Sequence, residues 1–151
     1  MLPIKRILCA TDFSEPSFKG IEAANELADH FSAELIFINV VTPLYPIGAP
    51  GVPSGYKAEK YYEEMDQFAN TSLEEMEKER ITTGVKTQRV VVQGNAVDEI
   101  IKRAENENVD VIVIATHGWT GWRKWVFGSV TDKVVRLATC PVLTVSRSKE
   151  T

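Results

Sequence analysis

Residues 115–131 combine glycines, polar side chains and the expected start of a helix, in the sequence A-T-H-G-W-T-G-W-R-K-W-V-F-G-S-V-T. They follow an apolar run at 109–114 whose length and β-branched content predict a buried strand. They lead into 129–138, which we expect to be helical, with Ser129 as its N-cap and Asp132 in its first turn. The first amide groups of a helix have no internal acceptors, and the helix dipole places roughly half a positive charge there. This order of strand, loop and helix start favours the binding of an anion.

The glycines at 118, 121 and 128 bear on the same chemistry. Glycine can adopt positive φ, and without a side chain it lets a phosphate approach the backbone. We therefore predict that this loop holds the phosphates of a nucleotide; simple turns without a ligand are the alternative. Two other phosphate motifs are absent from the sequence. There is no G-x-x-x-x-G-K-[ST], and the turn A-T-D-F-S after the first expected strand has no glycine, which excludes a dinucleotide fingerprint.

The elements that must position this loop alternate between apolar, strand-like runs and amphipathic, helix-like segments. We expect strands at 5–10, 35–41, 86–93, 109–114 and 141–145, and helices at 14–31, 58–81, 96–106 and 129–138. Such alternation predicts an α/β fold of the doubly wound, Rossmann-like type, with a mainly parallel five-stranded sheet and helices on both faces. On the long second helix, periodicity predicts an apolar face toward the core. Its members are Tyr61, Met65, Phe68, Leu73 and Met76.

Length and composition limit the classes of protein to consider. The chain has 151 residues, which fits a single domain, 1–151. Its net charge of −4 argues against non-specific binding to nucleic acid or to an acidic membrane, since both favour basic surfaces. No apolar run is long enough to span a membrane, and the first residues do not form a signal peptide.

Two further compositional features concern the cysteines and a proline-rich stretch. Cys9 and Cys140 lack the spacing of metal ligands, and we expect both to be reduced thiols in a cytoplasmic protein. Residues 42–57 hold four prolines and three glycines, which predicts a flexible loop without regular structure.

In a doubly wound sheet, ligands bind beyond the carboxyl ends of the strands, where the winding direction reverses. Here these ends carry Asp12, Val40 and the loop that starts at Ala115. Asp12 therefore has two interpretations, as a ligand contact in this crevice or as a cap of the next helix. We expect that helix to have Ser14 as its N-cap and Pro16 in its first turn.

The sequence resembles the universal stress protein family, in particular its ATP-binding subgroup. The similarity covers nearly the whole chain, from I-K-R-I-L-C-A-T-D near the start to C-P-V-L-T-V near the end. Its most specific part is the nucleotide motif of the family, G-x2-G-x9-G-[ST]. In this chain the motif stands as Ala115-x2-Gly118-x9-Gly128-Ser129, with the spacing intact and an alanine in place of the first glycine.

The resemblance implies that the loop and the helix start hold the phosphates of ATP, with or without Mg²⁺, and that no side chain binds a metal directly. The aspartate after the first strand takes the ribose hydroxyls, and the end of the second strand flanks the adenine. The implied nucleotide-binding residues are Ala10, Thr11, Asp12, Val40, Ile114, Ala115, His117, Gly118, Gly128, Ser129, Val130 and Thr131. Among them, His117 has a second interpretation, a hydrogen bond to a neighbouring carbonyl group.

The chain also departs from the family pattern. The methyl group of Ala115 is expected to weaken nucleotide binding without abolishing it. Gly94-Asn95-Ala96 stands where the family usually has G-x-P, which removes rigidity but no hydrogen-bond donor. Trp119, Trp122 and Trp125 differ from the residues that related loops carry, and the resemblance gives them no role.

Three functions agree with these features. The leading hypothesis is an ATP-binding module that responds to adenylate levels in stress or regulation, with an unidentified protein partner. The second is a slow ATP hydrolase, but Asp12 and His117 have no identifiable orienting partners, so no catalytic residue is assigned. The third is a dimeric interaction protein that binds no nucleotide. The resemblance also implies a homodimer through Val142–Val145, which a free sheet edge would favour.

Overall fold

The structure is a computed structural model that describes residues 2–43, 50, 57–117 and 127–146. Within these ranges strands and helices alternate as the sequence predicts. In chain order the elements are β1 (Arg6–Ala10), α1 (Glu15–Phe31), β2 (Glu34–Val41), α2 (Ala58–Arg80), β3 (Thr87–Gln93), α3 (Ala96–Asn106), β4 (Val111–Ala115), α4 (Ser129–Leu137) and β5 (Val142–Val145). Most of the predicted flexible loop at 42–57 lies outside the described residues, as do Gly118 and the tryptophans at 119, 122 and 125.

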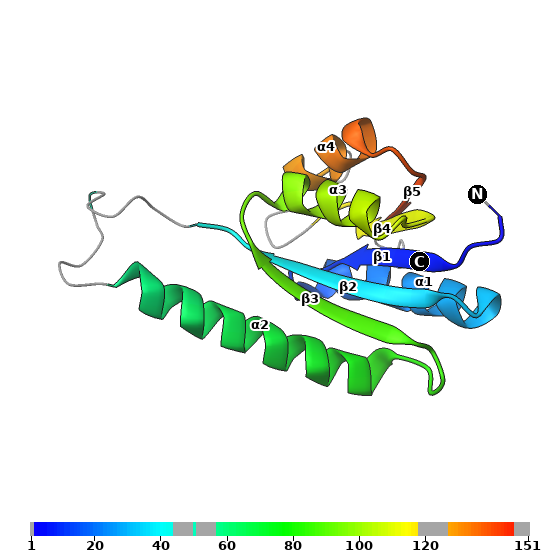
Figure 1. Ribbon diagram of the computed structural model, residues 1–151, viewed down its shortest axis with the longest axis horizontal. Coiled ribbons are helices and arrows are strands. Elements are labelled where there is room, and N and C mark those ends of the chain that lie inside the picture. The colour runs from blue at the N-terminus through cyan, green and yellow to red at the C-terminus, as the bar shows by residue number, and fades with distance from the viewer. Residues whose placement is uncertain (1, 44–49, 51–56, 118–126, 147–151) are drawn as a thin grey trace, which may run out of the picture.

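The strands form one sheet in the order β3-β2-β1-β4-β5, and every pairing is parallel. The predicted doubly wound α/β fold is therefore confirmed. The winding reverses at β1, because β2 and β3 follow on one side of it and β4 and β5 on the other (Figure 1). β1 and β2 last pair at Ala10 and Ile38, whereas β2 continues beside β3 as far as Val41. The carboxyl edge of the sheet is thus stepped at the point of reversal.

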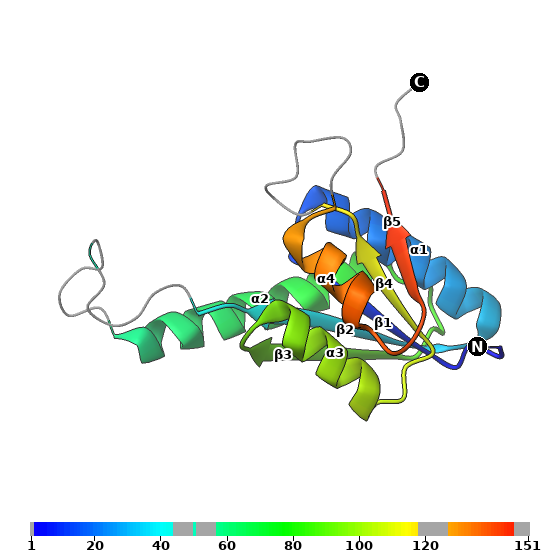
Figure 2. The same cartoon turned by 90° about the horizontal axis from the view of Figure 1, so that it is seen from above.

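Two apolar cores hold the helices on opposite faces of the sheet. α1 and α2 cover one face, and α3 and α4 cover the other (Figures 1 and 2). Side chains alternate along β1, so that Ile7 and Cys9 pack with α1 and α2 while Leu8 packs with α3 and α4. The nearly continuous apolar runs of the central strands follow from this coverage on both faces.

α2 departs from the sequence prediction in its first half. Ala69, Leu73 and Met76 are buried, whereas Phe68 is 58% exposed. The N-terminal end of α2 extends beyond the sheet, so this part of the helix has no strand to cover (Figure 1). The predicted apolar face therefore meets the core only in the second half. Neither α2 nor any other described helix has both the length and the apolar composition needed to cross a bilayer.

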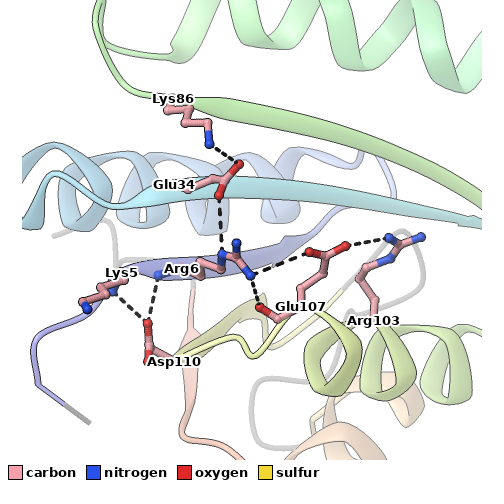
Figure 3. Close-up of polar contacts among 7 residues, drawn as sticks. All are labelled: Lys5, Arg6, Glu34, Lys86, Arg103, Glu107 and Asp110. Carbon is pink, nitrogen blue, oxygen red and sulfur yellow. Dashed lines mark hydrogen bonds and ion pairs between the residues drawn. The ribbon is translucent and has the colours of Figure 1, made fainter.

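Charged residues at the amino ends of the strands connect β1 to its neighbours (Figure 3). Oδ2 of Asp110 accepts hydrogen bonds from the backbone amides of Lys5 at 2.7 Å and Arg6 at 2.9 Å. These bonds, above all the one from Lys5, lower the pKa of the Asp110 carboxyl. The Arg6 guanidinium contacts Glu34 at 3.5 Å and donates a hydrogen bond of 2.7 Å to the carbonyl oxygen of Glu107. The cluster fixes this edge of the sheet and lies opposite the edge where ligands are expected.

The two cysteines are free thiols in protected positions. Cys9 is buried in β1, and burial raises the pKa of its thiol to about 12. Cys140 is partly buried just before β5, and burial likewise raises the pKa of its thiol. Both thiols are therefore protonated, and weakly nucleophilic, at neutral pH.

Candidate nucleotide site

A cleft with a volume of about 330 Å³ opens at the carboxyl edge of the sheet, between α3 and α4. It lies beside the point where the winding reverses, which is where doubly wound folds place their ligands. Its lining comprises Ala10, Thr11, Asp12, Ser17, Ile38, Asn39, Val40, Thr42, Ala96, Ile100, Ile114, Ala115, His117, Gly128, Ser129, Val130 and Thr131. The lining is apolar toward α3 and polar toward α4, so the two ends of the cleft suit chemically different parts of one ligand.

The apolar end is formed by aliphatic side chains of β1, β2, β4 and α3, and by the exposed step of β2. The last hydrogen bond between β1 and β2 in this region runs from the Thr11 amide to the Ile38 carbonyl, at 3.0 Å. Alternate residues of a parallel strand direct their peptide groups to the same side, so Val40 faces the same way as Ile38. Val40 is paired with Val92 of β3 on one side, but β1 has already ended on the other side, where no strand of the described chain pairs with Val40. The Val40 amide and carbonyl groups can therefore serve the polar edge of a planar base.

The turn after β1 carries Asp12 into the lining of the cleft, and because β1 lies between β2 and β4 in the sheet, Asp12 lies between the two ends. The Asp12 side chain is exposed, and its Oδ1 accepts hydrogen bonds from both the amide and the hydroxyl of Ser14. The carbonyl group of Thr11 accepts a hydrogen bond of 2.9 Å from the side-chain amide of Asn39, which ties this turn to β2. Ser14 is also the N-cap of α1, as predicted, and Pro16 lies in the first turn.

The polar end is formed by the first turn of α4, where two sequence expectations were wrong. The N-cap is Gly128 and not Ser129, because Ser129 is already helical while Gly128 is extended, with φ −57° and ψ 153°. Gly128 therefore does not use positive φ. Its own amide is not unpaired either, since it donates a hydrogen bond of 2.7 Å to the Thr116 carbonyl. A β-carbon at Gly128 would lie 3.4 Å from that carbonyl oxygen, at the limit of ordinary van der Waals contact.

A glycine N-cap leaves the start of α4 without a side-chain hydrogen bond. The first helical bond of α4 runs from the Asp132 amide to the Gly128 carbonyl at 3.0 Å. The amides of Ser129, Val130 and Thr131 precede it and have no acceptor within the helix. They lie at the polar end of the cleft, where three amide dipoles and the helix dipole favour an anion.

His117 lines the same end of the cleft and is held by its neighbour. Its Nδ1 shares a hydrogen bond of 2.9 Å with the Thr116 hydroxyl. Its Nε2 is buried and has no hydrogen-bond partner among the described residues. A buried imidazole nitrogen without a partner is costly, and a polar atom of a ligand would satisfy it.

The cleft brings together all the nucleotide-binding residues expected from the sequence except Gly118, which lies outside the described residues. Sequence reasoning missed six further lining residues: Ser17, Ile38, Asn39, Thr42, Ala96 and Ile100. Ile38, Asn39 and Thr42 flank the predicted Val40, so the expected position at the strand end was a usable signal. Ser17 and Ile100 look like ordinary inward-facing helix residues, and only the packing of the helices brings them to the cleft.

Comparison with known proteins identifies the family. The sequence model of the universal stress protein family matches residues 3–146. The chain belongs to the universal stress protein family.

Individual universal stress proteins are similar over almost the whole chain. Universal stress protein MJ0531 of Methanocaldococcus jannaschii is 33% identical over 146 residues, which are 97% of this chain and 84% of that protein. The solved structure of MJ0577, from the same organism, has a TM-score of 0.79 and 28% identity, and the match covers 97% of this chain and 99% of that one. A universal stress protein solved in complex with cAMP has a TM-score of 0.67 and 19% identity, with 96% and 98% of the two chains covered. At that identity the last similarity concerns the fold.

Proposed function

We propose that this universal stress protein binds ATP in the cleft between α3 and α4 and acts as an adenylate-responsive stress or regulatory module. The observation that carries the proposal is the order of three groups along the cleft. The open edge of β2 at Val40 lies at the apolar end, Asp12 lies between, and the uncapped start of α4 lies at the polar end. Base, ribose and phosphates follow each other in the same order along an adenine nucleotide. The complex of a structural neighbour with cAMP adds support.

Each part of the ligand has a group of matching chemistry. The aliphatic side chains around Val40 offer the adenine an apolar surface, and the backbone of Val40 offers one donor and one acceptor. The Asp12 carboxylate accepts hydrogen bonds from ribose hydroxyls. The amides of Ser129, Val130 and Thr131, together with Gly118 of the motif, bind phosphate oxygens. Mg²⁺ would be held by the phosphates of ATP, without a direct protein ligand.

The proposal extends to assembly and location. β5 lies at the edge of the sheet, and Leu143 within it is 40% exposed. An open edge with exposed apolar side chains suits pairing with a second copy, so we propose a homodimer through Val142–Val145. We further propose that residues 1–151 form one domain in the cytoplasm and that the nucleotide state is communicated to a protein partner.

Titration of the purified protein with ATP and Mg²⁺, followed by calorimetry and by tryptophan fluorescence, tests the proposal. A saturable signal with one nucleotide per chain is expected, and mass spectrometry of small molecules that co-purify should identify an adenine nucleotide. The absence of a saturable signal up to millimolar ATP would contradict the proposed function. Phosphate release measured in the same samples separates simple binding from hydrolysis.

A further inference from the structure

The open edge of β2 at Val40 has a local cause in the side chains around it. β2 lies between β1 and β3 (Figure 1), and its successive residues direct their peptide groups to the two neighbours in turn. The Ile38 carbonyl faces β1, since it accepts a hydrogen bond of 3.0 Å from the Thr11 amide. The Val41 carbonyl faces β3, since it accepts one of 3.1 Å from the Gly94 amide. The amide and carbonyl groups of Val40 therefore face the side of β1.

One further step of the parallel ladder would engage both of these groups. It would require a bond from the Val40 amide to the Thr11 carbonyl and another from the Phe13 amide to the Val40 carbonyl. Neither bond is present in the described part of the chain, where the pairing of the two strands ends at Ala10 and Ile38. The ladder thus stops one step short of Val40.

Side-chain groups take the place of Val40 in both bonds. The Thr11 carbonyl accepts a hydrogen bond of 2.9 Å from Nδ2 of Asn39. The Phe13 amide donates one of 3.0 Å to Oγ1 of Thr11. Both backbone groups that follow β1 are therefore satisfied without Val40. Within the described residues, Val40 is left with an amide and a carbonyl group that have no partner on this side.

The two replacements differ in what supports them. Phe13 has a left-handed backbone conformation, with φ 62°, which ends the extended run of β1. Its ring packs edge to face against Phe68 of α2, with 6.0 Å between the ring centroids, so the turn is also held from that helix. The shape of the turn therefore disfavours a bond from Phe13 to the Val40 carbonyl. On the other half of the step, the Asn39 side chain alone among the described groups competes with the Val40 amide for the Thr11 carbonyl.

We propose that Asn39 is a positioning residue that ends the β1–β2 ladder one step early and so keeps the Val40 amide free as a hydrogen-bond donor. The inference rests on the proposed function and adds to it the residue that maintains the donor. The matching ligand group is an unprotonated ring nitrogen of a planar base, such as N1 of adenine. Asn39 does not need to touch the base, because its own amide group is bonded to Thr11. Without Asn39, the partly buried Thr11 carbonyl would need another donor, and the Val40 amide is the one that the ladder supplies.

The first experiment measures hydrogen exchange of the Val40 amide by NMR in the ligand-free protein. In Asn39→Leu, which has no donor, we expect this amide to bond Thr11 and to exchange about tenfold or more slowly than in the wild type. Asn39→His keeps a donor nitrogen at the same position along the side chain, and its Val40 amide should exchange as in the wild type. Circular dichroism checks the fold. If Asn39→Leu does not fold, Asn39→Asp, which has the same shape and no donor at neutral pH, replaces it.

A matched control removes another asparagine that joins two elements. Asn25 of α1 donates a hydrogen bond of 3.0 Å to the Thr82 hydroxyl and accepts one of 2.9 Å from the Thr82 amide. It does not line the cleft. Asn25→Leu should leave both the exchange of the Val40 amide and the affinity for ATP unchanged.

The second experiment is calorimetric titration with ATP and with 1-deaza-ATP, in which a C–H group replaces N1 of the base. For the wild type we expect the Kd of 1-deaza-ATP to be about tenfold higher than that of ATP. Asn39→Leu should raise the Kd of ATP about tenfold and change that of 1-deaza-ATP by less than about twofold. The variant would then no longer distinguish the two nucleotides.

The results separate the inference from the function on which it rests. If the wild type binds ATP, a Val40 amide that is already protected without ligand, or equal exchange in the wild type and Asn39→Leu, overturns the inference alone. Equal weakening of ATP and 1-deaza-ATP by Asn39→Leu also overturns it, because the loss would not involve the ring nitrogen. A wild type that binds no ATP overturns the proposed function and the role of Val40 toward a base, whereas the exchange rates still decide whether Asn39 ends the ladder.

Discussion

The hydroxyl group of Thr131 donates a hydrogen bond of 2.7 Å to the carbonyl oxygen of Ala115, within the protein interior. It joins the first turn of α4 to the end of β4. The bond from the Gly128 amide to the Thr116 carbonyl joins the N-cap of α4 to the residue that follows β4. Together the two bonds hold the start of α4 in a fixed orientation before any ligand arrives, which lowers the entropic cost of binding.

Thr131→Val tests how much the hydrogen bond from Thr131 to the Ala115 carbonyl contributes to stability and to ATP binding, because valine has a similar shape and no hydroxyl. The Ala115 carbonyl would lose a buried donor, so we expect the free energy of unfolding to fall by about 1–3 kcal/mol. ATP should bind more weakly, whereas adenosine, which lacks phosphates, should bind as before. Urea denaturation and calorimetry measure the two effects. Thr131→Ser keeps the hydroxyl and should bind ATP like the wild type, although the lost buried methyl group lowers its stability slightly. Equal losses for ATP and adenosine in Thr131→Val would contradict the role at the phosphate end.

Gly128→Val tests the close approach at the N-cap of α4. A β-carbon would lie 3.4 Å from the Thr116 carbonyl oxygen, at the limit of ordinary contact. The two γ-methyl groups of valine extend further, and we expect them to displace the helix start. We expect ATP binding to fall below detection, while strain lowers stability by about 1–3 kcal/mol and leaves the fold intact. Circular dichroism checks the fold and calorimetry the binding. Undiminished affinity in a folded variant would remove the start of α4 from the ligand site.

Ala115→Gly restores the glycine that the family motif has at this position. Alternation along β4 places the Ala115 side chain with Val111 and Val113, on the face covered by α1. The backbone of Gly20 lies there, since a β-carbon on Gly20 would be 3.5 Å from the Ala115 nitrogen. The methyl group therefore faces away from α3 and α4, which replaces the weakening expected from the sequence with an expected Kd change for ATP of less than about twofold. A tenfold gain in affinity would instead mean that the methyl group crowds the nucleotide.

Glycine within a strand should lower the stability of this variant by about 0.5–1 kcal/mol, which thermal unfolding can detect.

Asp110→Ala concerns the charged cluster at the opposite edge. The pKa of Asp110 is lowered in the folded protein, so its carboxylate contributes stability at pH values above its ordinary pKa of 3.8. That contribution is lost as the pH falls through the lower folded pKa. We expect the variant to be about 1 kcal/mol less stable than the wild type at neutral pH, and the difference to shrink as the pH falls below 3.8. Urea denaturation across this range measures it, and a difference independent of pH would contradict the assignment.

Thr144→Pro tests the proposed dimer. The carbonyl groups of Pro141 and Val145 point toward β4, since they accept bonds from Ile112 and Thr116. By alternation, the Thr144 amide points to the outer edge of β5, and proline removes it without breaking the bonds to β4. We expect light scattering at micromolar concentration to give a dimer for the wild type and for the control Thr144→Val, and a monomer for Thr144→Pro. A monomeric wild type would rule out the proposed dimer.

The sequence predicted the sheet and the helices well, because apolar runs and helix periodicity report local burial directly. Ser14 was recognised as an N-cap for the same local reason. The N-cap of α4 was placed one residue late, since Ser129 carries the usual cap side chain and Gly128 carries none. What fixes Gly128 as the cap is its bond to Thr116, across a loop. The exposure of Phe68 was missed because periodicity does not reveal where a sheet ends.

The position of the cleft was predicted from the strand ends, but several of its lining residues were not predicted. Asn39 and Ser17 enter the site through side-chain bonds to Thr11, and such contacts between elements leave no pattern in the sequence. Ile100 has the spacing of a core residue, and it is one; it reaches the cleft only because α3 lies over the step in the sheet.

That step, where β2 runs on past the end of β1, has an evolutionary consequence. A binding site formed by strands of unequal length has the sheet itself as its base. That base is kept as long as the sheet is kept, even when the surrounding loops change. Substitutions around the site can then change which small molecule binds, or its affinity, without a change of fold. The same sheet can in this way support sites for different small molecules in related proteins.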